Sequence, residues 1–261
     1  MEISWSEVAD RVWVTTVDPD AANVTLIAGD DRAMLVDAGG TADVGAALLT
    51  SARTLVTVPV DTVVITHHHA DHWHGIAGMS DVETIAHECI VDDTTSAEFR
   101  PTTLISVLKG IQLGERFVEI AHFGKAHTQS DLVVVVPSAD VIVVGDLVED
   151  EPQFDETTQF DTWPLTLDGV LTSSKPSTVV IPGHGPITNR DAVIDCSGRI
   201  ADMYTTTSTL VQQGVQLEQL YESAERWAFS EPTVRQALPL LVDELASHGV
   251  VARKQLPIQG I

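Results

Sequence analysis

Apolar residues in the first 182 positions fall in short runs that polar turns separate. Runs at 11–17, 23–29 and 60–66 have the length and β-branched content of buried strands. Similar runs predict further strands at 32–40, 83–88, 116–123, 131–137, 140–146 and 177–183. Two other segments, 41–53 and 161–176, have the spacing of helices. Strands interspersed with helices in this way predict a layered α/β fold.

The pattern changes after Pro186, where helical periodicity replaces the short apolar runs. We predict three helices there, at 189–214, 215–229 and 231–249. The expected organisation is a main body over residues 1–188 and a helical C-terminal segment over 189–261. We expect this segment to pack on the same domain, because about 70 residues would form only a small core by themselves.

The charge balance restricts the classes of partner. The chain has 38 acidic and 14 basic residues, a formal net charge of −24. Such a field repels nucleic acid and anionic membrane surfaces, so neither is an expected partner of this acidic protein. The expected partner is a small-molecule substrate. The helices of the C-terminal segment could also form the interface of a homo-oligomer.

Cysteine usage and the N-terminus indicate the compartment. Cys89 and Cys196 are far apart and belong to no CxxC motif, which favours free thiols in a reducing cytosol. The first ten residues have neither a basic nor an apolar signal region. No apolar run approaches the ~20 residues of a membrane helix. These features predict a cytoplasmic location.

The stretch VITHHHADHWHGIAG, residues 64–78, contains five histidines and an aspartate directly after a predicted strand. Metal-binding side chains must converge to about 2.0–2.2 Å from a zinc-like ion. On an extended strand end, His67 and His69 can face the same side. Asp71 and His72 fall where the chain turns, and one tetrahedral ion cannot easily take all four side chains. The spacing therefore suits a second ion beside the first.

Three later strand ends offer further metal-binding side chains. His127 follows the strand at 116–123, Asp146 ends the strand at 140–146, and His184 follows the last predicted strand. Ligands at several strand ends describe a site built by loops on a sheet scaffold. A chance arrangement of all these residues is improbable, although each one alone would be ordinary.

In this order, the residues resemble the motifs of the metallo-β-lactamase superfamily across residues ~10–190. The resemblance implies a four-layer αβ/βα sandwich with a binuclear metal site on one edge. It implies a first metal held by His67, His69 and His127, a second held by Asp71, His72 and His184, and a bridging Asp146. It also implies that Asp37 supports the metal loops without binding a metal.

The charge count at such a site favours hydrolysis. Two divalent ions, two ligand carboxylates and one hydroxide leave about +1, which would attract a carbonyl oxygen. We expect the hydroxide between the metals to attack, and the resemblance suggests that Asp71 passes a proton to the leaving group. Zinc is the expected metal, although iron and manganese share the same ligand preferences.

The resemblance excludes several classes of substrate but does not identify a single one. Family β-lactamases usually have Cys or Ser where this chain has Asp146, and the chain lacks the flavin domain of the flavodiiron branch and the basic arm of the nucleases. Small thioesters, lactones and esters remain, with glyoxalase II the nearest comparison. The alternatives are a mononuclear iron persulfide dioxygenase and a non-catalytic metal-dependent binding or sensing protein. Candidates for substrate contact, with core packing as the competing interpretation, are Trp73, His74, Phe154 and Trp163.

Overall fold

The N-terminal half of the chain forms a seven-stranded sheet. The computed structural model describes residues 3–92, 95–222 and 226–252. The strands follow one another in chain order, antiparallel from β1 to β4 and parallel from β4 to β7. They are β1 (Ser6–Ala9), β2 (Val12–Val17), β3 (Ala22–Ala28), β4 (Ala33–Val36), β5 (Val60–Val64), β6 (Glu83–His87) and β7 (Thr103–Ile105). Between them lie α1 (Ala42–Leu55), α2 (Ala70–Trp73) and the 3₁₀ turns η1 (His74–Gly78), η2 (Glu88–Ile90) and η3 (Ala97–Phe99).

A second sheet of five strands faces the first. Its order is β12-β11-β10-β9-β8, and only β11 and β12 are parallel, because α3 connects them. The elements are β8 (Leu108–Leu113), β9 (Arg116–Ala121), β10 (Val133–Val136), β11 (Val141–Gly145), α3 (Trp163–Thr172) and β12 (Val179–Pro182).

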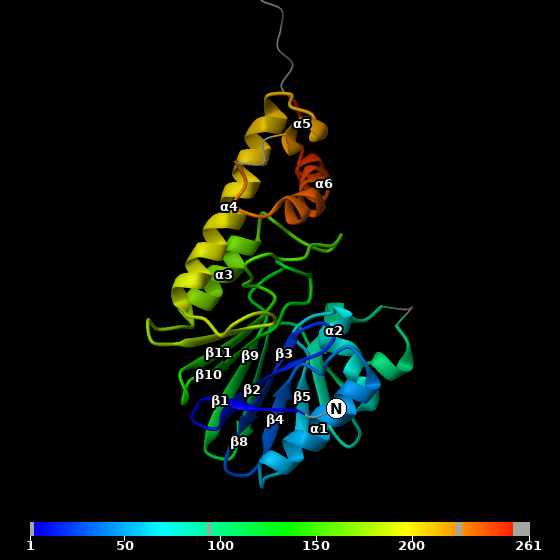
Figure 1. Ribbon diagram of the computed structural model, residues 1–261, viewed down its shortest axis with the longest axis vertical. Coiled ribbons are helices and arrows are strands. Elements are labelled where there is room, and N and C mark those ends of the chain that lie inside the picture. The colour runs from blue at the N-terminus through cyan, green and yellow to red at the C-terminus, as the bar shows by residue number, and fades with distance from the viewer. Residues whose placement is uncertain (1–2, 93–94, 223–225, 253–261) are drawn as a thin grey trace, which may run out of the picture.

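Alternation of side chains along the strands produces four layers. In β4, Leu35 packs toward α1, whereas Met34 and Val36 point into the space between the sheets. In β10, Val134 points into that same space, whereas Val135 packs toward α3 and the C-terminal helices. The predicted α/β sandwich is therefore confirmed, with helices on both outer faces (Figure 1).

Close backbone contact fixes the turn after α2 against the first sheet. Gly75 donates a backbone hydrogen bond to Gly39 O at 2.7 Å. A Cβ at Gly75 would lie 1.8 Å from Ala38 O, so only glycine allows this approach. The contact seats the histidine-rich turn on the loop that follows β4.

The C-terminal segment is helical and shares a core with the second sheet. Figure 1 shows α4 (Arg190–Gln212), α5 (Leu217–Tyr221) and α6 (Glu231–Ser247) beyond the loop end of the sandwich. Ile200 of α4 and Leu241 of α6 belong to the same buried apolar cluster as Val144 of β11. Within the described ranges, each helix is too short or too polar to cross a membrane.

Two sequence predictions about secondary structure are wrong. The helix predicted at 215–229 ends at Tyr221, and residues 223–225 of that prediction lie outside the described ones. Trp227 and Phe229 are instead buried in the core, so their apolar spacing serves packing and not a helix face. The prediction also omitted β1, β7 and β8, which are short or carry polar residues at alternate positions.

The two cysteines differ in accessibility. Cys89 in η2 is half-buried and Cys196 in α4 is 1% exposed, and both thiols are free. Burial raises the pKa of Cys196 to about 11. We expect a maleimide to label only Cys89 in the native protein, and both thiols after denaturation, as mass spectrometry would count. Modification of Cys196 in the folded protein would contradict this packing.

Candidate metal centre and its cavity

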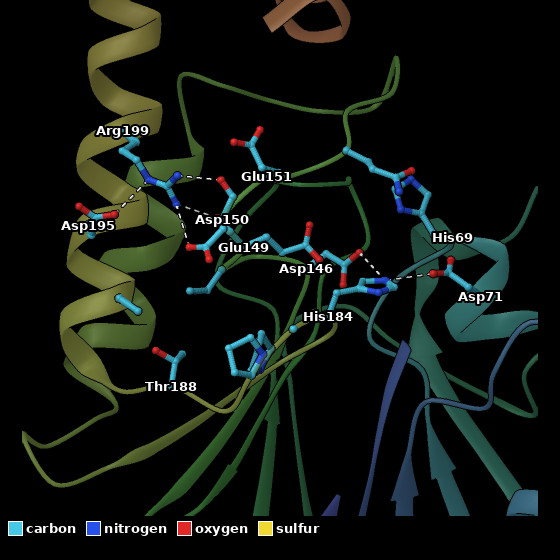
Figure 2. Close-up of a pocket in the computed structure, with 16 residues that line it drawn as sticks. His69, Asp71, Asp146, Glu149, Asp150, Glu151, His184, Thr188, Asp195 and Arg199 are labelled. Carbon is cyan, nitrogen blue, oxygen red and sulfur yellow. Dashed lines mark hydrogen bonds and ion pairs between the residues drawn. The ribbon is translucent and has the colours of Figure 1, made fainter. Parts of the chain in front are cut away.

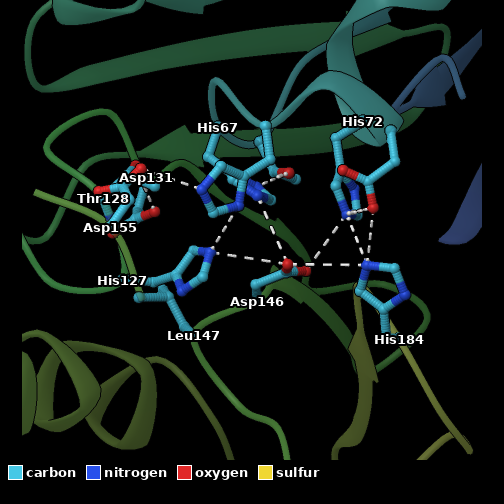
Figure 3. A network of polar contacts seen from close by, with 12 residues as sticks. His67, His72, His127, Thr128, Asp131, Asp146, Leu147, Asp155 and His184 are labelled. Atoms are coloured by element: carbon cyan, nitrogen blue, oxygen red, sulfur yellow. Dashed lines mark hydrogen bonds and ion pairs between the residues drawn. The ribbon is translucent and has the colours of Figure 1, made fainter. Parts of the chain in front are cut away.

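Loops at one edge of the sandwich bring together the histidines and aspartates that follow the strands. His67 and His69 follow β5, His127 follows β9, Asp146 directly follows β11, and His184 follows β12. Figure 3 shows the side chains of His67, His127, Asp146 and His184 converging from these separate segments. All five come from positions that the sequence places immediately after strands or a few residues beyond them, which is why they share one edge.

The first cluster consists of three histidines and Asp146, whose candidate ligand atoms lie within 4.8 Å of one another. His127 Nε2 is 3.0 Å from His69 Nδ1. Asp146 Oδ2 is 3.5 Å from His67 Nε2 and 3.6 Å from His127 Nε2. Four donor atoms therefore surround one small volume.

The second cluster consists of Asp71, His72 and His184. His184 Nε2 is 3.0 Å from Asp71 Oδ2 and 3.1 Å from His72 Nε2. The same Nε2 of His72 lies 3.4 Å from Asp146 Oδ1. Asp146 therefore lies between the two clusters, with Oδ1 near His72 and with Oδ2 near the first cluster and 3.7 Å from His184 Nε2.

Asp37 holds ligand-bearing residues of both clusters in place. Its backbone has φ 70°, a left-handed conformation that directs the carboxylate under the centre. Oδ2 is 2.8 Å from His72 Nδ1, and Oδ1 accepts the backbone N–H of Thr66 at 2.8 Å. The Thr66 hydroxyl donates to Asp37 and lies 3.0 Å from His67 Nδ1. With Nδ1 of His67 and His72 engaged in this way, each Nε2 faces the centre.

The histidines of the centre differ in the direction in which their surroundings shift their pKa values. Burial lowers the pKa of His67 to about 4 and lowers that of His127 well below its usual value. Both imidazoles are therefore neutral at pH 7, with a lone pair available. Burial alone would also lower the pKa of His72, but the charges of Asp146 and Asp37 outweigh it and raise that pKa to about 10. The carboxylates around His72 thus favour a positive charge at the second cluster.

Asp155 is a site residue that the sequence analysis missed. Its Oδ2 lies 3.0 Å from His69 Nε2 and 3.0 Å from His68 Nε2. Its Oδ1 accepts hydrogen bonds from the backbone N–H and the hydroxyl of Thr157. Asp155 therefore turns His69 Nδ1 toward the first cluster. Its position within the acidic stretch 149–161 gave no sequence signal that distinguished it from its neighbours.

Two further acids, Asp131, which is buried, and Glu149, which is partly buried, were also missed. Asp131 accepts hydrogen bonds from the backbone and hydroxyl of Thr128, next to His127, and burial raises its pKa to about 8. Glu149 follows Asp146 by three residues. Burial raises the pKa of Glu149 well above its usual range, and the charge of Asp146 raises it further.

A cavity of about 390 Å³ opens from the second cluster toward α4. Asp71, Asp146 and His184 lie at its inner end, and Arg199 lies on its α4 side (Figure 2). A small molecule in this cavity would therefore reach both the clusters and the C-terminal segment.

The four residues expected to contact substrate lie elsewhere. Phe154 and Trp163 are 3% and 0% exposed in the core under the centre, which corrects that expectation for both. Trp73 is 8% exposed and donates to Phe99 O, and His74 stacks on the Phe99 ring at 4.2 Å. Trp73 and His74 line a separate cavity. Contact of these two residues with a substrate therefore stays a prediction.

Comparison with known proteins identifies the family and the fold. Residues 17–184 match the family described as Metallo-beta-lactamase superfamily. A "Metallo-beta-lactamase type 2" from Bacillus cereus is 23% identical over 205 residues, which are 74% of this chain and 80% of the relative. A metallo-beta-lactamase structure from Pontibacter korlensis superposes with a TM-score of 0.69 at 19% identity, covering 77% of this chain and 100% of that one. One from Hirschia baltica gives 0.65 at 18% identity, with 76% and 97% covered.

Proposed function

Because the chain belongs to the metallo-β-lactamase superfamily, we propose that it is a hydrolase that uses two divalent cations to cleave small thioesters, lactones or esters. His67, His69 and His127 would hold one cation, and Asp71, His72 and His184 the other. The observation that carries the proposal is the position of Asp146, whose carboxylate lies within 3.7 Å of imidazole nitrogens of both clusters. One carboxylate shared by two donor sets suits a binuclear centre.

The donor atoms fit cations of this kind. Ligands of a tetrahedral zinc ion lie about 3.3 Å from one another. The donor atoms of each cluster lie within 4.8 Å of one another, and the contacts in and between the clusters include separations of 3.0 to 3.7 Å. Among the described residues, His67 Nε2 and Asp146 Oδ1 are buried without any hydrogen-bond partner. Buried polar atoms are rarely left in that state, so a cation bonded to each of these atoms is a direct explanation.

The chemistry divides between the cations and the side chains. When bound, the cations supply Lewis acidity toward a carbonyl oxygen and make water nucleophilic near neutral pH. Asp37, Thr66 and Asp155 fix the rings that carry the donor nitrogens. The cavity beside Asp71 and His184 admits the acyl group from the α4 side.

Asp71 is the proposed proton carrier. Burial alone would raise its pKa, but the hydrogen bond with His184 and the charge of His72 outweigh burial and lower the pKa to about 2. The carboxylate is therefore ionised at neutral pH, as a group must be to accept a proton from the attacking water. Because Asp71 lines the cavity and is 24% exposed, it can deliver that proton to a leaving group.

Metal content and turnover test the proposal together. We expect purified protein to contain about two divalent ions per chain, with zinc the first expectation and iron or manganese alternatives. Thioesters, lactones and aryl esters should be hydrolysed by this protein, and chelation should abolish the hydrolysis until metal is restored. A β-lactam belongs in the same panel, because curated relatives carry the name β-lactamase. Asp146 makes it the weaker expected substrate.

The alternative functions give different results in the same experiment. One iron per chain together with oxygen uptake on a persulfide would indicate a dioxygenase. Two ions per chain without turnover of any substrate in the panel would indicate a binding or sensing protein. Either result would overturn the proposed hydrolase.

Asp155→Asn should weaken the first cation site. The amide keeps the size of the side chain but loses the negative charge beside His69 Nε2. Loss of such a carboxylate typically costs about 10- to 100-fold in metal affinity. Competition with a chromogenic chelator measures the affinity, and exposed Glu156→Gln on the same loop is the matched control. Equal affinity in both variants would exclude a positioning role for Asp155.

A further inference from the structure

Acidic residues dominate the cavity beyond the proposed metal ligands. Glu149, Asp150, Glu151 and Asp195 line it, against the single guanidinium of Arg199. The whole chain also carries a formal net charge of −24, so the long-range field has the same sign as the cavity.

Arg199 is engaged mainly with groups of the protein itself, although its buried Nε makes no hydrogen bond among the described residues. Its Nη1 and Nη2 donate to the backbone oxygens of Asp150 and Glu149 at 2.7 and 2.8 Å. Its Nε lies 3.0 Å from Asp195 Oδ2, and its guanidinium carbon lies 4.8 Å from the centre of the Phe229 ring. Arg199 therefore fastens the loop after β11 to α4 and is poorly placed to bind the carboxylate of a substrate.

Glu149 differs from the other acids of the cavity. Asp195 pairs with Arg199, and Glu151 accepts hydrogen bonds from the backbone and hydroxyl of Ser230. Glu149 Oε1 is buried and, within the part of the chain that the structure describes, has no hydrogen-bond partner. An oxygen of Glu149 lies within 4.8 Å of candidate ligand atoms of Asp146 and His184. Figure 2 shows these three side chains together at the inner end of the cavity.

We propose that the cavity selects substrates that carry a protonated amine close to the scissile carbonyl, and that Glu149 accepts a hydrogen bond from that ammonium group. This inference rests on the proposed hydrolase, because it names the substrate class of the same site. An ammonium group supplies the donor that Glu149 Oε1 lacks, and a carboxyl oxygen can accept a hydrogen bond whether or not the group is ionised. A carboxylate in the same place would face several acidic side chains, and Arg199 is the one guanidinium among the described lining residues.

The position of Glu149 limits the spacer between amine and carbonyl. Because Glu149 lies next to the proposed ligands of the second cation, the amine must be only a few bonds from the carbonyl carbon. Aryl thioesters of 3-aminopropanoic, butanoic and succinic acid form a suitable series. They place an ammonium, a methyl or a carboxylate group at the end of similar short acyl chains.

The test compares kcat/KM for the three thioesters on metal-loaded protein after the uncatalysed rate is subtracted. We expect the amine to be preferred over the methyl compound by about 10-fold or more, and the carboxylate to be the poorest. Glu149→Gln, with its metal content verified, should remove most of this preference. Glu151→Gln, at a residue already bonded to Ser230, should reduce it less. Exposed Glu218→Gln removes the same charge far from the cavity and should leave the preference intact.

Binding of the free acids separates this inference from the proposed function. Calorimetry should show 3-aminopropanoate binding to the metal-loaded protein more tightly than butanoate, and Glu149→Gln should abolish the difference. Turnover of all three thioesters at equal kcat/KM would overturn the inference and leave the hydrolase standing. Amine-selective binding without turnover would support the inference and overturn the hydrolase. A preference that survives in Glu149→Gln would exclude Glu149 as its origin.

Discussion

Asp146→Ala is expected to abolish hydrolysis and to leave fewer than two tightly bound ions per chain. The carboxylate is 5% exposed, and its two oxygens lie 3.4 to 3.7 Å from imidazole nitrogens of both clusters. Removing it takes one donor from each proposed cation. It also removes one of the two ligand carboxylates, Asp71 and Asp146, whose negative charges balance the cations. We expect kcat/KM to fall roughly 10³-fold or more, a loss typical of removing an essential metal ligand.

The matched control for this substitution is Asp168→Ala, at an exposed position on α3. It removes the same side chain and the same charge without touching the centre. Elemental analysis and thioester hydrolysis, measured on both variants, distinguish a local effect from a general one. If Asp146→Ala retained two ions and normal turnover, the bridging role and with it the binuclear mechanism would be wrong.

Trp163→Ala is expected to produce the largest loss of stability among simple core substitutions near the centre. The indole is completely buried, lies 5.5 Å from the His127 ring, and donates from Nε1 to Leu147 O at 3.0 Å. Truncating a buried tryptophan costs about 3–5 kcal/mol, and an unpaired carbonyl adds about 1 kcal/mol. Urea unfolding should therefore show a much lower midpoint for this variant.

Trp163→Phe separates the packing contribution from that of the hydrogen bond. Phenylalanine retains most of the buried area but cannot donate to Leu147 O, so we expect a smaller loss of stability than in Trp163→Ala. A substrate-contacting tryptophan would give the opposite pattern, with unchanged stability and an increase in KM. Unchanged unfolding of Trp163→Ala would contradict the core position of this residue.

The superfamily and the α/β sandwich were predictable from sequence because the necessary signals are local. Apolar runs such as 60–66 and 140–146 identify buried strands without any knowledge of their partners. The His and Asp residues that follow such strands come to one edge whenever the strands enter the same sandwich. The supporting role of Asp37, which stands directly after β4, was predicted only from the resemblance to the superfamily.

The positions of Asp155, Glu149 and Trp163 depended on contacts between distant parts of the chain. Asp155 reaches His69 across 86 positions, and Glu149 faces the cavity because Arg199, 50 positions away, binds its backbone. The stretch 149–163 mixes acids and aromatics without periodicity, so its sequence alone could not indicate which side chains turn inward.

The sandwich and the types and order of the candidate metal ligands could be predicted from the chain alone, because strand periodicity and ligand chemistry are properties of single segments. Long-range contacts were needed to show which acid positions His69, which aromatic residues are buried, and which cavity carboxylate among the described residues has an unpartnered oxygen. These features arise where the loop after β11 packs between the two sheets and α4. Their physical basis is competition for burial and hydrogen bonds among segments that are remote in the chain.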